Sequence, residues 1–143
     1  PYGVMAIACP NTQPLAAFMS LVLPAIAMGN NVVVIPAQDD PLVLSDLYQV
    51  FDTSDLPGGV VNILTGPQSD ILTPIASHMD VDAVWGFGPK AQSAEIEKAS
   101  AQNLKRTWVN NGAARDWFGA QGEGRAFLEA ATEVKNIWIP YGE

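Results

Sequence analysis

Short apolar runs recur along the chain, and segments with the periodicity of amphipathic helices separate them. Such runs are too short for buried helices, and residues that are apolar on both faces are typical of strands inside a parallel sheet. Strands that alternate with helices are joined by right-handed crossovers. The sequence therefore predicts an α/β fold of the Rossmann type, a mostly parallel sheet with helices on both faces. The expected strands lie at Gly3–Cys9, Asn31–Ile35, Val60–Leu64, Val81–Phe87 and Leu104–Val109.

Proline and glycine mark the ends of the expected helices. Pro14 opens the first helix, because the N–H groups of a first helical turn have no partner within the helix and proline can lack one at no cost. Gly29-Asn30 stops this helix. Pro89 opens a later helix for the same reason. The helices are expected at residues 14–28, 41–51, 70–78, 89–101 and 125–131.

The pattern changes after Asn110. Gly119, Gly122 and Gly124 indicate a flexible connector, and an apolar segment with the character of a strand follows it. We therefore expect three parts: a Rossmann-like domain at residues 1–112, a connector at 113–131, and a C-terminal strand of the oligomerisation type at 132–143.

The charge balance excludes two classes of partner. The 143 residues include 7 basic and 15 acidic side chains, which gives a net charge of −8. Nucleic acids and anionic membranes are bound through Lys and Arg, so we expect neither as a partner. The single cysteine, Cys9, cannot form an internal disulfide, which favours a reducing compartment such as the cytoplasm. Because the chain starts at Pro1, we expect it to be a segment of a longer polypeptide.

The order of landmarks resembles that of the aldehyde dehydrogenase superfamily. Residues 54–66 read Ser-Asp-Leu-Pro-Gly-Gly-Val-Val-Asn-Ile-Leu-Thr-Gly, which is similar to a glycine-, asparagine- and threonine-containing segment of that family. From Gly3 to Asn110 the glycines and prolines follow the family's cofactor domain, and Thr132–Ile139 resembles its C-terminal strand. In the family a catalytic domain separates these two parts. The resemblance implies that the connector at residues 113–131 replaces it.

At the positions where the family performs its chemistry, this chain holds other residues. The family's oxyanion-stabilising asparagine corresponds to Thr12, although a shift of one residue would bring in Asn11 or Gln13. The general-base glutamate corresponds to Asn110, whose amide takes up no proton near neutral pH. Cys9 ends a buried strand, where the pKa of a thiol rises, so we interpret it as a core residue rather than a nucleophile.

The nucleotide-binding positions also differ from the family pattern. Ile35 stands where the family has a lysine that contacts the adenosine ribose, and Gln38 could still bond one hydroxyl. Pro89 removes a backbone N–H and a hydroxyl from the turn that meets the pyrophosphate. Lys90 is either an anion contact or a solvated residue at a helix start. The resemblance thus implies no catalytic, cofactor-binding or metal-binding residue in this segment.

The resemblance is strongest to the second, degenerate domain of the two-domain family-16 aldehyde dehydrogenases. It implies a non-catalytic pseudo-aldehyde-dehydrogenase module with a structural and assembly role. The parent polypeptide would be an NAD-dependent aldehyde dehydrogenase, with NAD bound by an upstream catalytic module. Two alternatives stay open: a residual dinucleotide- or anion-binding regulatory module, and a divergent enzyme that uses Lys90, Asp116 and Arg115.

The terminal segment is the expected interaction element. In the resembling family the C-terminal strand joins the catalytic-domain sheet of the adjacent subunit. The resemblance therefore implies that this strand pairs with the catalytic module of the same polypeptide or of its mate in a homodimer. The alternative is an antiparallel edge strand on its own sheet. The interaction strand comprises Val134, Lys135, Asn136, Ile137, Trp138 and Ile139.

Overall fold

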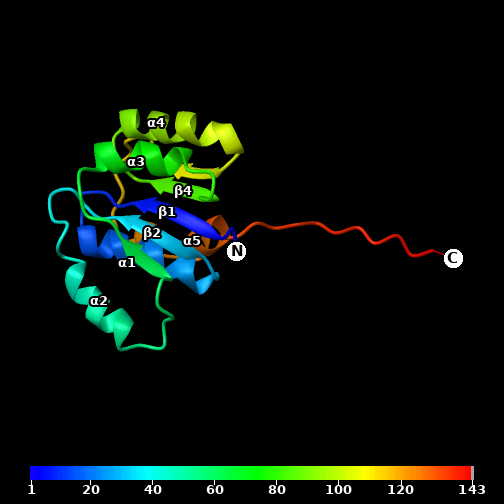
Figure 1. The fold of residues 1–143 in the computed structure, drawn as a ribbon, viewed down its shortest axis with the longest axis horizontal. Coiled ribbons are helices and arrows are strands. Elements are labelled where there is room, and N and C mark those ends of the chain that lie inside the picture. The colour runs from blue at the N-terminus through cyan, green and yellow to red at the C-terminus, as the bar shows by residue number, and fades with distance from the viewer. Residues whose placement is uncertain (143) are drawn as a thin grey trace.

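The computed structural model describes residues 1–142 and contains a five-stranded sheet (Figure 1). All paired strands run parallel, in the order β3-β2-β1-β4-β5. The chain moves outward from β1 to β2 and β3, and then returns past β1 to form β4 and β5. The five expected strands and the Rossmann-type fold are thereby confirmed. Their bounds are β1 Val4–Ala8, β2 Asn31–Ile35, β3 Val61–Ile63, β4 Ala83–Gly86 and β5 Arg106–Val109.

Helices cover both faces of the sheet, as expected. The crossovers that contain α1 and α2 lie on one face, and those that contain α3 and α4 lie on the other (Figure 1). This division follows from the right-handed crossover, because the chain reverses its direction across the sheet between β3 and β4. The helices are α1 Pro14–Ala27, α2 Ser45–Asp52, α3 Gln68–Ser77, α4 Lys90–Ser100 and α5 Arg125–Ala130, with short 3-10 turns at Ala101–Asn103 and Ala120–Gly122.

The core has two halves because β1 is apolar on both faces. Met5 and Ile7 pack with α1 in the larger half. Ala6 and Ala8 alternate with them and pack with α3 and α4 in the smaller half, around Ile96. Burial on both faces explains why the central strands are continuous apolar runs in the sequence.

The connector is folded, so the expectation that it is flexible is wrong. Trp117, Phe127 and Ala131 are buried in the same half of the core as α1. Gly122 is also buried, and a Cβ at this position would overlap the carbonyl oxygen of Trp117. The glycine therefore permits close packing of two backbone segments. Residues 113–131 thus cover the part of the sheet that α1 leaves open.

Within the described chain the terminal segment pairs with no strand, and its expected pairing with a catalytic module stays a prediction. From residue 133 the described part of the segment extends away from the body (Figure 1). Trp138 is 92% exposed and Val134 is 87% exposed. A strand needs a neighbour for its backbone N–H and C=O groups, and none of the five strands pairs with this segment. The alternative of an edge strand on its own sheet is therefore wrong for the isolated chain.

None of the helices in residues 1–142 has the length and apolar character that crossing a membrane requires.

Candidate functional site

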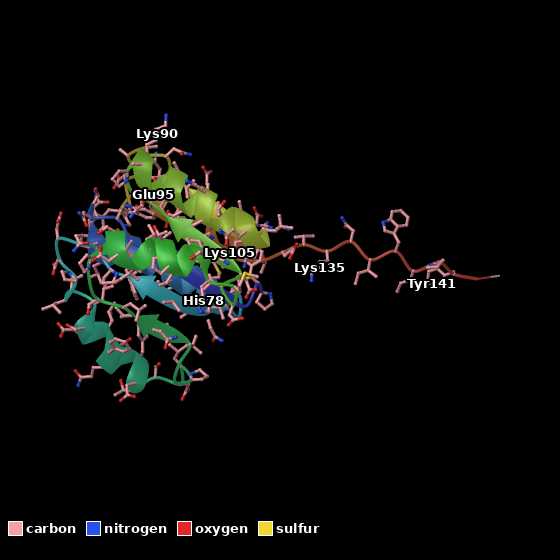
Figure 2. All side chains as sticks on the ribbon, turned by 45° about the horizontal axis from the view of Figure 1, so that its top comes forward. His78, Lys90, Glu95, Lys105, Lys135 and Tyr141 are labelled. Atoms are coloured by element: carbon pink, nitrogen blue, oxygen red, sulfur yellow. The ribbon has the colours of Figure 1, made fainter. Side chains whose placement is uncertain are left out.

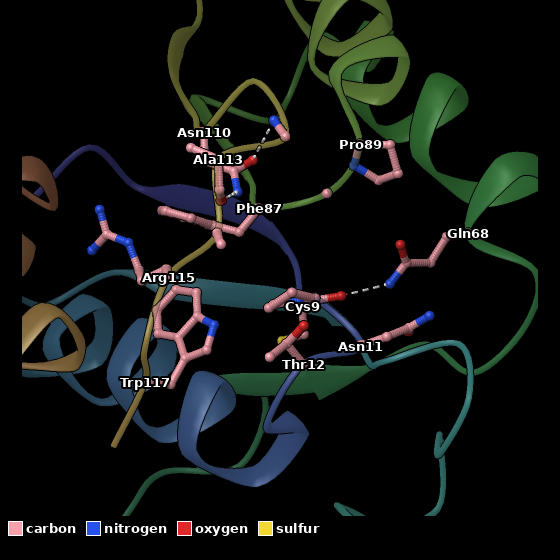
Figure 3. A pocket seen from close by; sticks show the side chains of 14 residues that line it. Cys9, Asn11, Thr12, Gln68, Phe87, Pro89, Asn110, Ala113, Arg115 and Trp117 are labelled. Carbon is pink, nitrogen blue, oxygen red and sulfur yellow. Dashed lines mark hydrogen bonds between the residues drawn. The ribbon is translucent and has the colours of Figure 1, made fainter. Parts of the chain in front are cut away.

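A cavity of about 390 Å³ opens at the carboxyl ends of β1, β4 and β5 (Figure 3). The chain order reverses between β1 and β4, and open α/β sheets bind ligands at this reversal point. The cavity is therefore the candidate site. Its lining consists of Cys9, Pro10, Asn11, Thr12, Gln68, Phe87, Gly88, Pro89, Asn110, Gly112, Ala113, Ala114, Arg115 and Trp117.

The loop after β1 supplies Thr12 to the cavity, while the amides on either side of it bind other parts of the chain. Asn11 Oδ1 accepts hydrogen bonds from the backbone N–H groups of Gln38 (2.7 Å) and Asp39 (3.4 Å). Gln13 has a left-handed backbone, and its Oε1 accepts from the Trp117 N–H at 2.7 Å. Both amides thus have structural partners. Thr12 also lines the cavity.

Burial makes Cys9 a poor nucleophile. The side chain is almost completely buried at the end of β1, and this burial raises the pKa of the Cys9 thiol to about 12. Only a very small fraction of the thiol is ionised near neutral pH, and the thiolate is the reactive form. The structure therefore agrees with the interpretation of Cys9 as a core residue.

Hydrogen bonds link three glutamines, Gln38, Gln68 and Gln92, at and beside the cavity. Gln38 Oε1 accepts from the backbone N–H of Gln68 at 2.8 Å, in the first turn of α3. Gln68 Nε2 donates to the carbonyl oxygen of Cys9 at 2.9 Å (Figure 3). It also donates to the carbonyl oxygen of Pro36 at 2.8 Å, which joins the ends of β1 and β2. Gln92 Nε2 donates to Gln68 Oε1 at 3.0 Å. Gln38 is therefore already engaged by the protein.

Sequence reasoning missed Gln68 and Gln92. The one signal that points to them is their position, since each lies in the first turn of a helix that follows a strand of the sheet. Gln92 also lies so close to Gly88 that a Cβ there would overlap its amide. Together the two residues occupy the region next to the start of α4.

The start of α4 places Pro89 in the cavity wall and Lys90 outside it. Lys90 is exposed, and Figure 2 shows its side chain directed away from the body. Asp116 does not line the cavity either, and its Oδ1 accepts from Gln13 Nε2 at 3.2 Å. The structure therefore does not gather Lys90, Asp116 and Arg115 around one cavity.

Asn110 lines the cavity directly after β5. Its Nδ2 donates to the carbonyl oxygen of Ala113 at 2.7 Å, and its Oδ1 accepts from the Gly112 N–H at 3.4 Å. The side chain thus closes its own turn. An amide in this role holds the loop in shape and transfers no proton.

Arg115 sits among four aromatic rings, an arrangement that sequence reasoning missed. Its guanidinium carbon lies 5.2 Å from the ring centre of Phe87, 5.6 Å from Trp108, 5.4 Å from Trp117 and 5.5 Å from Phe127. Burial lowers the pKa of the guanidinium, which nonetheless stays protonated near neutral pH. Each ring attracts the cation through its quadrupole, so Arg115 ties the connector to the sheet.

The lining of the cavity lacks a group suited to proton transfer near neutral pH. Cys9 and Arg115 are the ionisable side chains among the lining residues, and neither changes charge in that range. Within residues 1–142, no group of three or more His, Cys, Asp and Glu side chains has the arrangement of a metal site.

Residues 1–118 match the family model described as the aldehyde dehydrogenase family. The chain belongs to the aldehyde dehydrogenase family. Among curated relatives, it is 35% identical over 114 residues to "Aldehyde dehydrogenase, cytosolic 1" of Elephantulus edwardii, and 37% identical over 113 residues to aldehyde dehydrogenase 1A1 of Mus musculus. These matches cover 79% and 78% of this chain.

Solved structures of the family have the same fold. An apo indole-3-acetaldehyde dehydrogenase aligns with a TM-score of 0.75 at 31% identity and covers 80% of this chain. Aldehyde dehydrogenase C from Pseudomonas syringae, solved with NAD⁺ and octanal, aligns with a TM-score of 0.73 at 32% identity and covers 76%. The chain spans about a quarter of the length of these relatives, from 22% to 27%.

Proposed function

We propose that this chain is a non-catalytic aldehyde dehydrogenase module with a structural and assembly role in a larger NAD-dependent aldehyde dehydrogenase. The observation that carries the proposal is the chemistry of the cavity at the sheet's carboxyl edge. Its lining holds no carboxylate, histidine or lysine, and its one thiol has a pKa of about 12. Oxidation of an aldehyde through an acyl-enzyme needs a reactive nucleophile and a base.

The family positions support the same proposal. Thr12 and Asn110 line the cavity, and we assign to them the positions of the family's oxyanion donor and general base. The Asn110 amide is held by Ala113 and Gly112, and so it closes a turn. We place the chain as the degenerate C-terminal domain of a two-domain family-16 aldehyde dehydrogenase, whose upstream module performs the catalysis.

The residues at the nucleotide positions do not fit NAD. Ile35 is fully buried and offers no hydrogen bond to a ribose. Gln38 is bonded to Gln68, and Pro89 lacks an N–H at the start of α4. NAD is thus assigned to the upstream catalytic module of the parent. The alignment with a structure that holds NAD⁺ supports NAD as the cofactor of the parent.

The terminal segment is the docking element of the module. Val134, Ile137, Trp138 and Ile139 expose between 68% and 92% of their surface, which is costly for large apolar side chains without a partner. We assign this segment to an open sheet edge of the catalytic module, in the same polypeptide or in the mate of a homodimer. The relative named as cytosolic supports a cytoplasmic location.

The test is NADH formation by the purified chain with NAD⁺ and octanal. We expect no rate above that of a blank without protein. A Cys9→Ser variant serves as the control, because it removes the one thiol of the chain. A rate in the unsubstituted chain that disappears in this variant would overturn the proposal.

The docking role has its own test. The parent polypeptide is compared with a variant that lacks Val134–Glu143, and hydrogen exchange is measured along the sheet edges of its catalytic module. We expect faster exchange in one edge strand when the segment is removed, because its backbone N–H groups lose their partners. Equal exchange in both proteins would show that the segment has another role.

A further inference from the structure

Another cavity lies between residues 110–115 and α5, and we call it the connector cavity. Its volume of about 500 Å³ is within the range of small-molecule sites. Asn110 and Arg115 line both this cavity and the one at the carboxyl edge. Figure 3 shows the Arg115 guanidinium directed away from Cys9 and Thr12, and its carbon lies 5.5 Å from the ring of Phe127 in α5. The charged end of Arg115 therefore belongs to the connector cavity.

Arg115 is a half-buried cation without an anionic partner. The ion pairs among residues 1–142 join Arg106 to Glu133 and Arg125 to Glu129. Within this part of the chain, no carboxylate oxygen lies within 4.0 Å of the third arginine. Its Nη1 donates to one backbone carbonyl oxygen of the connector at 2.9 Å, which uses one of the five N–H groups of a guanidinium. The remaining N–H groups are donors that an anionic ligand can accept from.

Aromatic rings hold this guanidinium in place. Phe87, Trp117 and Phe127, whose ring centres lie 5.2–5.5 Å from its central carbon, are themselves buried. A cation fixed in this way loses little further freedom when a ligand binds, which favours binding. The planar fork of an arginine matches the two oxygens of a carboxylate, so the chemistry of the group points to a carboxylate ligand.

Glu123 is the acidic residue that lines the connector cavity. Its charge repels a simple anion, which would otherwise be the best ligand for Arg115. A molecule that carries an ammonium group beside its carboxylate removes this repulsion, because the ammonium group can face Glu123. Small apolar side chains form much of the remaining wall and leave room for a short carbon chain: Ala113, Ala114, Ala120 and Ala126.

We propose that the connector cavity binds a small zwitterion, such as an amino acid, with its carboxylate on Arg115 and its ammonium group toward Glu123. Part of the site lies beyond residues 1–118, the range that matches the family model, since Glu123, Ala126 and Phe127 belong to it. The site is also separate from the carboxyl-edge cavity that holds Cys9 and Thr12. This binding activity goes beyond the structural role proposed above and requires no catalysis.

The experiment is a titration of the full chain with glycine, β-alanine and 4-aminobutyrate, followed by calorimetry and by NMR of the backbone amides. The three probes differ in the separation of their charged groups. We expect the best of them to bind at least about tenfold more tightly than acetate or methylamine, each of which carries only one of the two charges. The amide signals that shift should lie within residues 110–127.

Glu123→Gln is the decisive variant, because Glu123 is exposed and its replacement leaves the aromatic rings around Arg115 untouched. The zwitterions should lose about tenfold or more in affinity, whereas acetate should bind more tightly once the repulsion is gone. Arg115→Gln should abolish the binding of both. The matched control is Arg125→Gln, since Arg125 is 89% exposed on its side chain and does not line the connector cavity. Circular dichroism verifies that each variant is folded.

Failure of all three zwitterions to bind at concentrations on the order of 50 mM would overturn the proposal. So would acetate that binds as tightly as the zwitterions, or a Glu123→Gln variant with both affinities unchanged. The Glu123→Gln result decides the matter even where Arg115→Gln is too unstable to test. None of these outcomes bears on NADH formation, so failure here leaves the non-catalytic assignment standing.

Discussion

The side-chain amide of Gln68 donates to the carbonyl oxygen of Cys9 at 2.9 Å, and so joins the first turn of α3 to the end of β1. A second bond to the carbonyl oxygen of Pro36, at 2.8 Å, extends the link to β2. At the reversal point of a parallel sheet, where a ligand's polar groups would meet the strand ends, the protein uses its own amide. The Gln68 side chain thus links the carboxyl ends of β1 and β2 without a ligand.

Gln68→Leu should destabilise the fold, because it leaves the Cys9 and Pro36 carbonyl groups without their donor. We expect a loss of about 1–3 kcal/mol in the free energy of unfolding, the usual cost of unsatisfied buried polar groups. Urea denaturation followed by circular dichroism measures it. Gln49→Ala on the exposed side of α2 is the control, with an expected change within about 0.5 kcal/mol. Equal midpoints for the two variants would contradict the role of Gln68.

Arg115→Ala should loosen the connector from the sheet. The substitution removes a cation from the centre of four aromatic rings and leaves a void among them. We expect a loss of about 1–3 kcal/mol in the free energy of unfolding, together with greater solvent exposure of Trp117 in fluorescence. Arg125→Ala is the matched control, because its side chain is 89% exposed and forms only a surface pair with Glu129. A red shift as large in the control would contradict the prediction.

The Cys9 thiol should be unreactive in the folded chain. Its pKa is raised to about 12 by burial, so the neutral form is favoured and the thiolate is rare at pH 8. Burial of the neutral thiol therefore contributes to the stability of the fold below the ordinary pKa of a thiol. This contribution is lost as the pH rises toward 12. Reaction with an aromatic disulfide at pH 8 should be slow in buffer and fast in urea. A native rate that matches the rate in urea would show that Cys9 is accessible.

The ion pair between Arg106 and Glu133, at the start of the terminal segment, should be lost at low pH. The Arg106 guanidinium lies 2.6 Å from Glu133, and its hydrogen bond and charge lower the pKa of the Glu133 carboxyl. A carboxyl with a lowered pKa stabilises the folded state above its ordinary pKa and loses this effect as the pH falls through the lowered value. NMR titration of Glu133 should therefore show a pKa below that of an unpaired glutamate, and Arg106→Gln should return it to normal. Identical titrations in the two proteins would rule out the pairing in solution.

The central strands of the sheet could be predicted because their signal is local. Runs such as Asn31–Ile35 are apolar on both faces, and burial on both faces is what a central parallel strand requires. The replacements expected at Thr12, Ile35 and Asn110 rest on the order of motifs alone and stay predictions. The order of elements and the family membership therefore followed from residues close together in the chain.

Contacts between distant residues decided the rest. Gln68 reaches Cys9 across 59 positions, and Gln13 accepts from Trp117 across 104, so no local pattern predicts either bond. The glycines of the connector suggested flexibility, because glycine serves mobile loops and close backbone packing alike, and the packing of Gly122 against Trp117 distinguishes the two. The sequence determined that Val134–Ile139 is apolar enough to pair with a sheet. The tertiary structure decided that the chain's own sheet does not supply the partner, because the segment leaves the body beyond Glu133.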